Sequence, residues 1–129
     1  MMVIEHLGLN VSDPAAMADW YVAHLGMRVV LAKDQPVPVR FVADSADHVM
    51  IEVYRNPAVV VPDYWAIDPL VLHLAFASDD VSGDYRRLLA AGATSAAAPN
   101  VLPTGDEIAI VRDPWGFAVQ LVRRRKPMR

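Results

Sequence analysis

The sequence predicts an α+β fold in which two βαβββ modules follow one another within a single domain, residues 1–129. Three observations carry this prediction: a short motif occurs twice, each copy is followed by a helical stretch that ends at a glycine, and each half closes with an apolar strand. Internal repetition of this kind indicates that one structural unit occurs twice in the chain. We expect module 1 at about 1–55, a linker at about 56–69, module 2 at about 70–123 and a basic tail at 124–129.

The repeated motif begins with a histidine in each half of the chain. Residues 6–13 read His-Leu-Gly-Leu-Asn-Val-Ser-Asp, and residues 73–80 read His-Leu-Ala-Phe-Ala-Ser-Asp-Asp. The closing strands, residues 49–55 and 117–123, are separated by nearly the same number of residues as the two histidine motifs. In this alignment Glu52 corresponds to Gln120. Identities are few, but order and spacing hold across most of the chain, so the two halves are predicted to share one topology.

The elements of each half follow from the periodicity of the apolar residues. In the first half, Asp13 is placed to cap a helix that has Pro14 at its first position and ends near Gly26. Strands are expected there at 3–11, 28–32, 37–43 and 48–54. In the second half we expect a helix at about 80–91, a tight turn at 113–116, and strands at 71–77, 94–97, 107–112 and 117–122.

Composition limits the class of protein. The chain has 129 residues, enough to bury a core, and no apolar run approaches the roughly 20 residues that cross a bilayer. The N-terminus lacks the pattern of a signal peptide, so we expect a cytoplasmic protein without a membrane partner. There is no cysteine, so any metal ion must be held by histidine, carboxylate or amide side chains.

The charge distribution argues against a nucleic-acid partner. Five of the 12 basic residues lie in the last seven positions, and the rest of the chain carries 7 basic against 15 acidic residues. The body is therefore acidic and offers no basic face to a phosphate backbone. The tail at 124–129 is predicted to be solvated and partly frayed.

Strand alternation places four polar residues on comparable sheet faces. In each strand the apolar set is expected to face the helix, which leaves the polar residues on the opposite face, mid-strand between apolar neighbours. If a pseudo-twofold axis relates the repeats, these equivalent positions approach one another. Taken singly, a histidine in such a strand is more often a hydrogen-bonded side chain than a metal ligand, and the glutamate and the glutamine are compatible with solvent-facing side chains. Recurrence in the repeat favours a metal site, with a ligand set that suits Zn, Ni, Co, Mn or Fe. The four residues are His6, Glu52, His73 and Gln120.

With these motifs in this order, the chain resembles the vicinal oxygen chelate superfamily, also called the glyoxalase/bleomycin resistance protein/dioxygenase superfamily. The resemblance lies in residues 4–13, 20–27, 51–54, 73–76 and 113–121 and spans about the whole chain. It implies mixed sheets that form a cup, the glyoxalase/bleomycin resistance/dihydroxybiphenyl dioxygenase-like fold. It also implies one divalent metal ion per site, held through the first and fourth strands of each module. By position, those ligands are His6, Glu52, His73 and Gln120.

Gln120 departs from the family pattern, in which metalloenzymes usually carry glutamate. In glyoxalase I that glutamate ligates the metal and shuttles the substrate proton. Two histidines, one glutamate and one glutamine are similar to the ligand set of methylmalonyl-CoA epimerase with its two modules exchanged. The subset His6, His73 and Glu52 also resembles the two-histidine-one-carboxylate triad of non-haem iron dioxygenases.

The resemblance thus implies a divalent-metal-dependent lyase or isomerase of the glyoxalase type. It would move a proton alpha to a carbonyl of a small oxygen-chelating substrate, with Glu52 as the catalytic base. The alternatives are a ring-cleaving non-haem iron dioxygenase and a metal-free protein that binds small molecules or antibiotics through the aromatic rings of Tyr54, Trp65 and Trp115. Because many relatives pair across subunits, a homodimer is expected, with the site inside one chain or shared between two.

Overall fold

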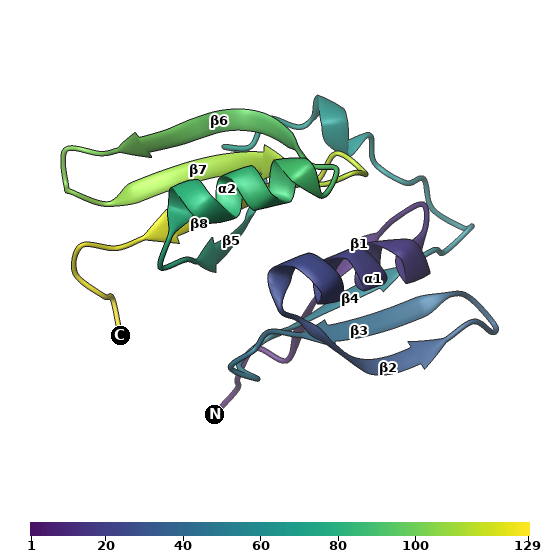
Figure 1. The fold of residues 1–129 in the computed structure, drawn as a ribbon. Coiled ribbons are helices and arrows are strands. Elements are labelled where there is room, and N and C mark those ends of the chain that lie inside the picture. The colour runs from purple at the N-terminus through teal and green to yellow at the C-terminus, as the bar shows by residue number, and fades with distance from the viewer. The chain divides into compact units, whose positions relative to one another are not determined.

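Each half of the chain folds as a four-stranded mixed sheet with one α-helix against one of its faces (Figure 1). The computed structural model describes all residues, 1–129, and these divide into two units, 1–62 and 63–129. The predicted α+β class and the predicted order of elements, βαβββ twice, are confirmed.

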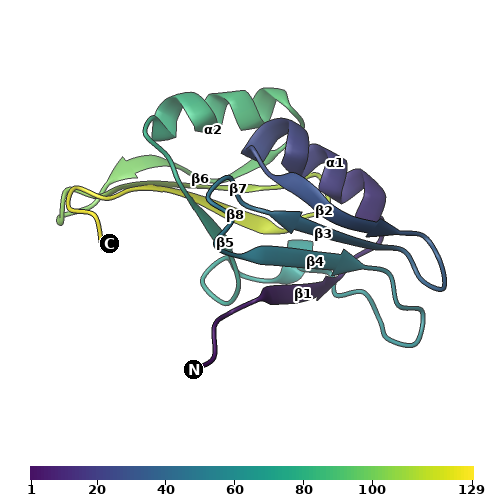
Figure 2. The same cartoon turned by 90° about the horizontal axis from the view of Figure 1, so that it is seen from below.

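The first unit contains one long helix and four strands. Its strands are ordered β1-β4-β3-β2, with β1 and β4 parallel and the other pairs antiparallel. The helix α1 contacts β2, β3 and β4 from one side (Figure 2). The elements are β1 (His6–Asn10), α1 (Pro14–Leu25), β2 (Arg28–Lys33), β3 (Val39–Ala43) and β4 (Met50–Tyr54).

The second unit repeats this topology. Its strands are ordered β5-β8-β7-β6, again with the outer pair β5 and β8 parallel. The helix α2 contacts β6, β7 and β8, and a short 3-10 turn, η1, precedes the sheet. The elements are η1 (Tyr64–Ala66), β5 (Leu74–Ala77), α2 (Val81–Ala90), β6 (Thr94–Val101), β7 (Glu107–Arg112) and β8 (Ala118–Arg123).

Both helices begin at an aspartate cap. The Asp13 carboxylate accepts a hydrogen bond from the Ala16 amide at 3.1 Å, and the Asp80 carboxylate accepts one from the Gly83 amide at 2.9 Å. Each carboxylate satisfies an amide of the first turn that has no partner within the helix. Helix α1 ends at Gly26, whose φ of 67° is the left-handed conformation that glycine adopts without steric cost. The predicted cap and helix end in the first half are confirmed.

The core of each unit lies between its helix and its sheet. In the second unit the inward set predicted for the last strand, Phe117, Val119 and Leu121, is at most 2% exposed. In the first unit Val11 is buried at 1%, but Leu7 remains 47% exposed although it was expected to pack against the helix. Leu7 lies near the start of an edge strand, which has a neighbouring strand on one side only.

Two predicted segments differ from the observed ones. Strand β1 begins at His6 and not at Val3, because its partner β4 begins at Met50, which pairs with His6. The tail was expected to be solvated and partly frayed; its residues are exposed, but its first two are held, since Arg124 forms an ion pair with Asp106 at 3.0 Å and the Arg125 amide donates to the same carboxylate at 2.9 Å. No helix is long and apolar enough to span a bilayer.

Candidate functional site

In the first unit, His6 and Glu52 share the sheet face that points away from α1. In the β1–β4 register, His6 pairs with Met50 and Gly8 pairs with Glu52, and residues that pair across strands carry their side chains on the same face. A Cβ atom on Gly8 would lie 3.4 Å from the Glu52 Oε1 and 3.3 Å from the Tyr54 ring. The missing side chain of Gly8 therefore makes the space that the Glu52 carboxylate uses.

The His6 imidazole is held in place from two sides. Its Nδ1 lies 2.9 Å from the Glu5 carboxylate, and its ring meets the Phe41 ring edge-on with centroids 5.2 Å apart. Because a carboxylate accepts and does not donate, this contact favours the proton on Nδ1. The Nε2 lone pair is then left to bind a metal ion or a substrate, and the side chain keeps 36% exposure.

In the second unit, His73 and Gln120 occupy equivalent places. Gln120 pairs with Ala75 of β5, just as Glu52 pairs with Gly8 of β1, and His73 lies two residues before Ala75. The expectation that both histidines lie mid-strand is wrong: His6 is the first residue of β1, and His73 immediately precedes β5. A turn at 68–72, in which the Val71 and Leu72 amides donate to the Asp68 carbonyl, delays the start of β5.

The His73 imidazole is also tethered through Nδ1. This atom lies 2.6 Å from the carbonyl oxygen of Pro69. A carbonyl can only accept, so Nδ1 carries the proton and Nε2 is the free ligand atom. A metal-binding histidine commonly donates its second ring N–H to a carboxylate or a backbone carbonyl in this way.

Arg112 fixes the segment to which His73 is tethered. Its guanidinium donates to the carbonyl oxygens of Tyr64 at 3.0 Å, Ile67 at 2.9 Å and Gly116 at 3.0 Å. Residues 64–69, the strap, are thereby attached to the end of the second sheet. Sequence reasoning missed Arg112; its one signal was a lone arginine at the end of the apolar run that precedes the 113–116 turn.

Two aromatic contacts complete the attachment of the strap. The Trp65 indole lies flat on Gly116, so close that a Cβ there would be 2.5 Å from the indole Cγ. The Tyr64 ring packs against Phe117 with centroids 5.3 Å apart. Gly116 has a φ of 92°, the left-handed region that favours glycine, in the turn that the sequence predicted. Of the three aromatic residues considered for ligand contact, Trp65 thus serves this attachment while remaining 48% exposed.

The two remaining candidates offer free oxygen atoms. The Glu52 carboxylate and the Gln120 amide are half-buried and make no hydrogen bond or ion pair within the chain. A divalent ion of the Zn, Ni, Co, Mn or Fe type accepts two imidazole nitrogens, a carboxylate oxygen and an amide oxygen, so the donor set fits such an ion. Within neither unit alone do three or more His, Asp or Glu side chains converge.

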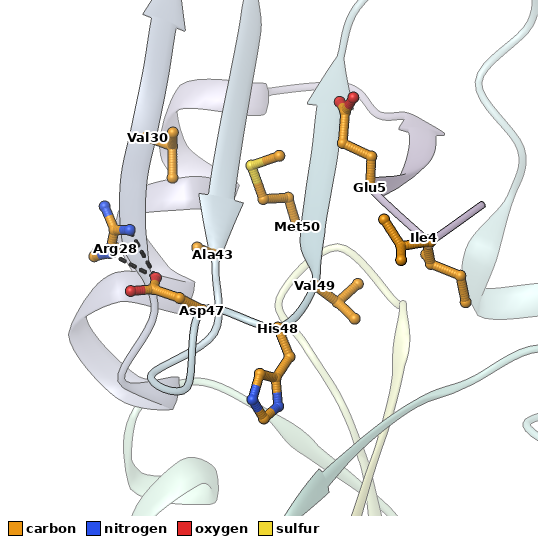
Figure 3. A pocket seen from close by; sticks show the side chains of 10 residues that line it. Ile4, Glu5, Arg28, Val30, Ala43, Asp47, His48, Val49 and Met50 are labelled. Carbon is orange, nitrogen blue, oxygen red and sulfur yellow. Dashed lines mark hydrogen bonds and ion pairs between the residues drawn. The ribbon is translucent and has the colours of Figure 1, made fainter. Parts of the chain in front are cut away.

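Beside His6, the same face of the first unit is hollowed into a pocket of about 450 Å³ (Figure 3). It lies where β2 and β4 begin and β3 ends, with the segment before β1 along one side. Met50, the register partner of His6, and Ala43, the partner of Met50, line it, so the pocket adjoins the His6 and Glu52 pair. Its apolar lining consists of Val3, Ile4, Val30, Ala43, Val49 and Met50.

The family follows from the match of the sequence as a whole. Residues 3–121 match the sequence model of the Glyoxalase/Bleomycin resistance protein/Dioxygenase superfamily. The chain belongs to this superfamily. No curated protein sequence matches it significantly.

Solved structures similar to the chain include an enzyme and a binding protein. Glyoxalase I from Zea mays is 23% identical with a TM-score of 0.77, over 97% of this chain and 46% of the maize chain. TnmS3, an antibiotic binding protein from Streptomyces sp. CB03234, is 22% identical with a TM-score of 0.71, over 94% of both chains. A glyoxalase family protein from Bacillus cereus is 13% identical with a TM-score of 0.80, over 95% of this chain and 93% of its own. At these identities the similarity establishes the fold.

Proposed function

We propose that the chain is a divalent-metal-dependent lyase or isomerase of the glyoxalase type, with His6, Glu52, His73 and Gln120 as the metal ligands. The observation that carries the proposal is that both histidines are tethered through the same ring atom, Nδ1. Each unit has an imidazole whose Nδ1 is bound to a local oxygen, at 2.9 Å in one unit and 2.6 Å in the other. Solvated histidines with no common role would not be expected to share this arrangement at equivalent positions of a repeat.

In this proposal Glu52 carries the proton. A bound divalent ion supplies Lewis-acid stabilisation to the oxyanion of a substrate that presents two adjacent oxygens. The Glu52 carboxylate takes a proton from the carbon alpha to the carbonyl and returns it to the product. Gln120 contributes a neutral oxygen and cannot exchange a proton, so the transfer depends on Glu52 alone.

The proposal is tested first by metal content. The protein is stripped with a chelator, reloaded separately with Zn, Ni, Co, Mn or Fe(II), desalted and analysed for bound metal. We expect about one ion per site in the wild type, its loss in His6→Ala and in His73→Ala, and full retention in His48→Ala, which removes an exposed histidine outside the ligand set. Absence of metal from the reloaded wild type, or equal retention by all variants, would overturn the proposal.

A second substitution separates catalysis from metal binding. Glu52→Gln keeps an oxygen ligand but removes the base, so the variant should retain metal and lose turnover of a true substrate. Turnover that persists in Glu52→Gln would remove Glu52 from the proton transfer. Preferential retention of Fe(II), together with oxygen consumption on catechols, would move the reaction class to ring cleavage.

We also propose that the two units act as one domain in a homodimer. Mixing two variant chains decides whether each site is supplied by one chain or by two. If His6 and Glu52 of one chain work with His73 and Gln120 of another, a heterodimer of His6→Ala and His73→Ala chains contains one intact site and regains metal. If each chain builds its own site, the mixture stays metal-free. A monomeric mass in light scattering would contradict the dimer.

A metal-free binding protein is the second candidate, and Gln120 is the residue that favours it. An amide in place of a carboxylate lowers the negative charge available to hold a cation. The similarity to an antibiotic binding protein is compatible with this function. Saturable quenching of tryptophan fluorescence by an organic ligand in protein that retains no metal would support it.

A further inference from the structure

The pocket beside His6 has a mainly apolar lining, and the one arginine on its rim is bound to Asp47. We propose that the pocket binds a neutral, apolar portion of the substrate or ligand, of the size of an aryl or branched alkyl group. This inference rests on the proposed function, because it assumes that the substrate carries this apolar group next to its chelating oxygens. The volume of about 450 Å³ lies within the range of roughly 300–1,000 Å³ that is usual for small-molecule sites.

The apolar lining is the first argument. Ala43 lies on the floor, 3% exposed, while Val30 and Ile4 on the walls remain 47% and 74% exposed. In Figure 3 the side chains of Val30 and Met50 stand on the same side of their strands, around Ala43. An apolar group bound there would remove these side chains from water, which favours its binding.

The charges on the rim are the second argument, because the one arginine among them is already bound to a carboxylate. Arg28 donates to the Asp47 carboxylate from Nη2 at 2.6 Å and from Nε at 3.0 Å. The Glu5 carboxylate is engaged by the His6 Nδ1 at 2.9 Å. His48 extends away from Val30 and Met50 in Figure 3. An anionic group placed in the pocket would lie near the Glu5 carboxylate and would find no free arginine, since Arg28 is bound to Asp47, so a neutral group is favoured over an anion.

The test uses two fluorescent probes with the same aromatic skeleton. N-phenyl-1-naphthylamine is neutral, and 1-anilinonaphthalene-8-sulfonate carries one negative charge. Titration into metal-free protein should show saturable binding of the neutral probe at about one equivalent per chain, and binding of the sulfonate about tenfold weaker or more. Equal affinity for the two probes, or no saturable binding of the neutral one, would overturn the proposal.

Two substitutions at one position locate the binding site. Val30→Asp places a charge in the pocket and Val30→Trp fills it, so each should weaken binding of the neutral probe about tenfold or more. The matched control is Val60→Asp, the same change at an 88% exposed valine outside the pocket, which should leave binding unchanged. A similar loss in the control, or no loss in either Val30 variant, would contradict the assignment.

Failure of the pocket proposal can be distinguished from failure of the metal proposal. Val30→Asp changes no proposed ligand, so its metal content after reloading should equal that of the wild type. Probe binding that responds to Val30 in a protein that retains no metal would support the pocket and refute the metal site. Metal retention without probe binding would refute the pocket alone.

Discussion

The Nδ1 atom of His73 donates a hydrogen bond to the carbonyl oxygen of Pro69 at 2.6 Å. Pro69 ends the strap, residues 64–69, and Arg112 binds two other carbonyl oxygens of the strap, those of Tyr64 and Ile67. The orientation of the histidine therefore depends on an arginine that does not touch it. This dependence gives Arg112 a positioning role in the proposed site.

Replacement of Arg112 by Ala should loosen the strap and weaken the His73 site together. We expect a loss of about 1–3 kcal/mol in the free energy of unfolding, because three carbonyl groups lose the guanidinium donor, and about a tenfold loss in metal affinity. Arg112→Lys should fall between the wild type and Arg112→Ala. Urea denaturation and metal titration measure the two effects. Arg87→Ala, which breaks an exposed ion pair with Asp84, is the control and should cost below about 1 kcal/mol. Unchanged metal affinity in a destabilised Arg112→Ala would make Arg112 purely structural.

Gly116→Ala should destabilise the protein through two separable effects. A Cβ atom meets the Trp65 indole at 2.5 Å, and an L-residue at a φ of 92° is strained by about 1–3 kcal/mol. A double-mutant cycle with Trp65→Ala separates them: the clash disappears in the double variant, while the backbone strain remains. Additive free energies of unfolding in the cycle would show that Trp65 does not lie on Gly116.

Gly8→Val should disturb the Glu52 carboxylate without unfolding the first unit. The added side chain needs the space beside the Glu52 Oε1 and the Tyr54 ring, which a Cβ already approaches to 3.4 and 3.3 Å. Metal affinity after reloading should fall, while the thermal unfolding midpoint changes little. The control is Leu7→Val, whose side chain points to the other face of β1. Equal metal affinity in Gly8→Val and the wild type would argue against Glu52 as a ligand.

Asp106 should hold the start of the tail across the neutral range. The backbone N–H of Arg125 and then the Arg124 guanidinium lower the pKa of this carboxyl below its ordinary value of 3.8. The carboxylate therefore contributes fully above that ordinary value, and its contribution is lost as the pH falls through the lowered pKa. We expect the Arg125 amide resonance to be constant from about pH 5 upwards and to shift only in strong acid.

Asp106→Asn supplies the companion test at neutral pH. It removes the charge that faces Arg124 and should speed trypsin cleavage after Arg123, Arg124 and Arg125, which mass spectrometry measures. Asp34→Asn, at another exposed ion pair with an arginine, should leave the cleavage rate unchanged. Equal cleavage of Asp106→Asn and the wild type would mean that the tail is held by other contacts.

Much of the fold could be predicted because it is encoded locally. The caps at Asp13 and Asp80 and the alternation in β4 and β8 depend on a few adjacent residues, and the repeat supplied the topology. The start of β1 and the exposure of Leu7 depend on where a partner strand begins, which a single strand does not reveal.

The candidate site was predictable as a set of positions, because alternation assigns each ligand to a face. What holds the ligands was not predictable. The Phe41 ring and the Arg112 guanidinium reach their partners through tertiary contacts across many residues. Glu5 is a sequence neighbour of His6, but adjacent side chains of a regular strand point to opposite faces, so the alternation pattern did not predict their contact.

The parallel pairing of β1 with β4 has a consequence for biosynthesis. The first strand of unit 1 cannot join its sheet until residues 50–54 have left the ribosome, although α1 can form earlier from local contacts. Until then Leu9 and Val11 have no partner strand, and their apolar side chains are open to wrong association. Because β5 pairs with β8 in the same way, the nascent chain passes through this exposed stage twice.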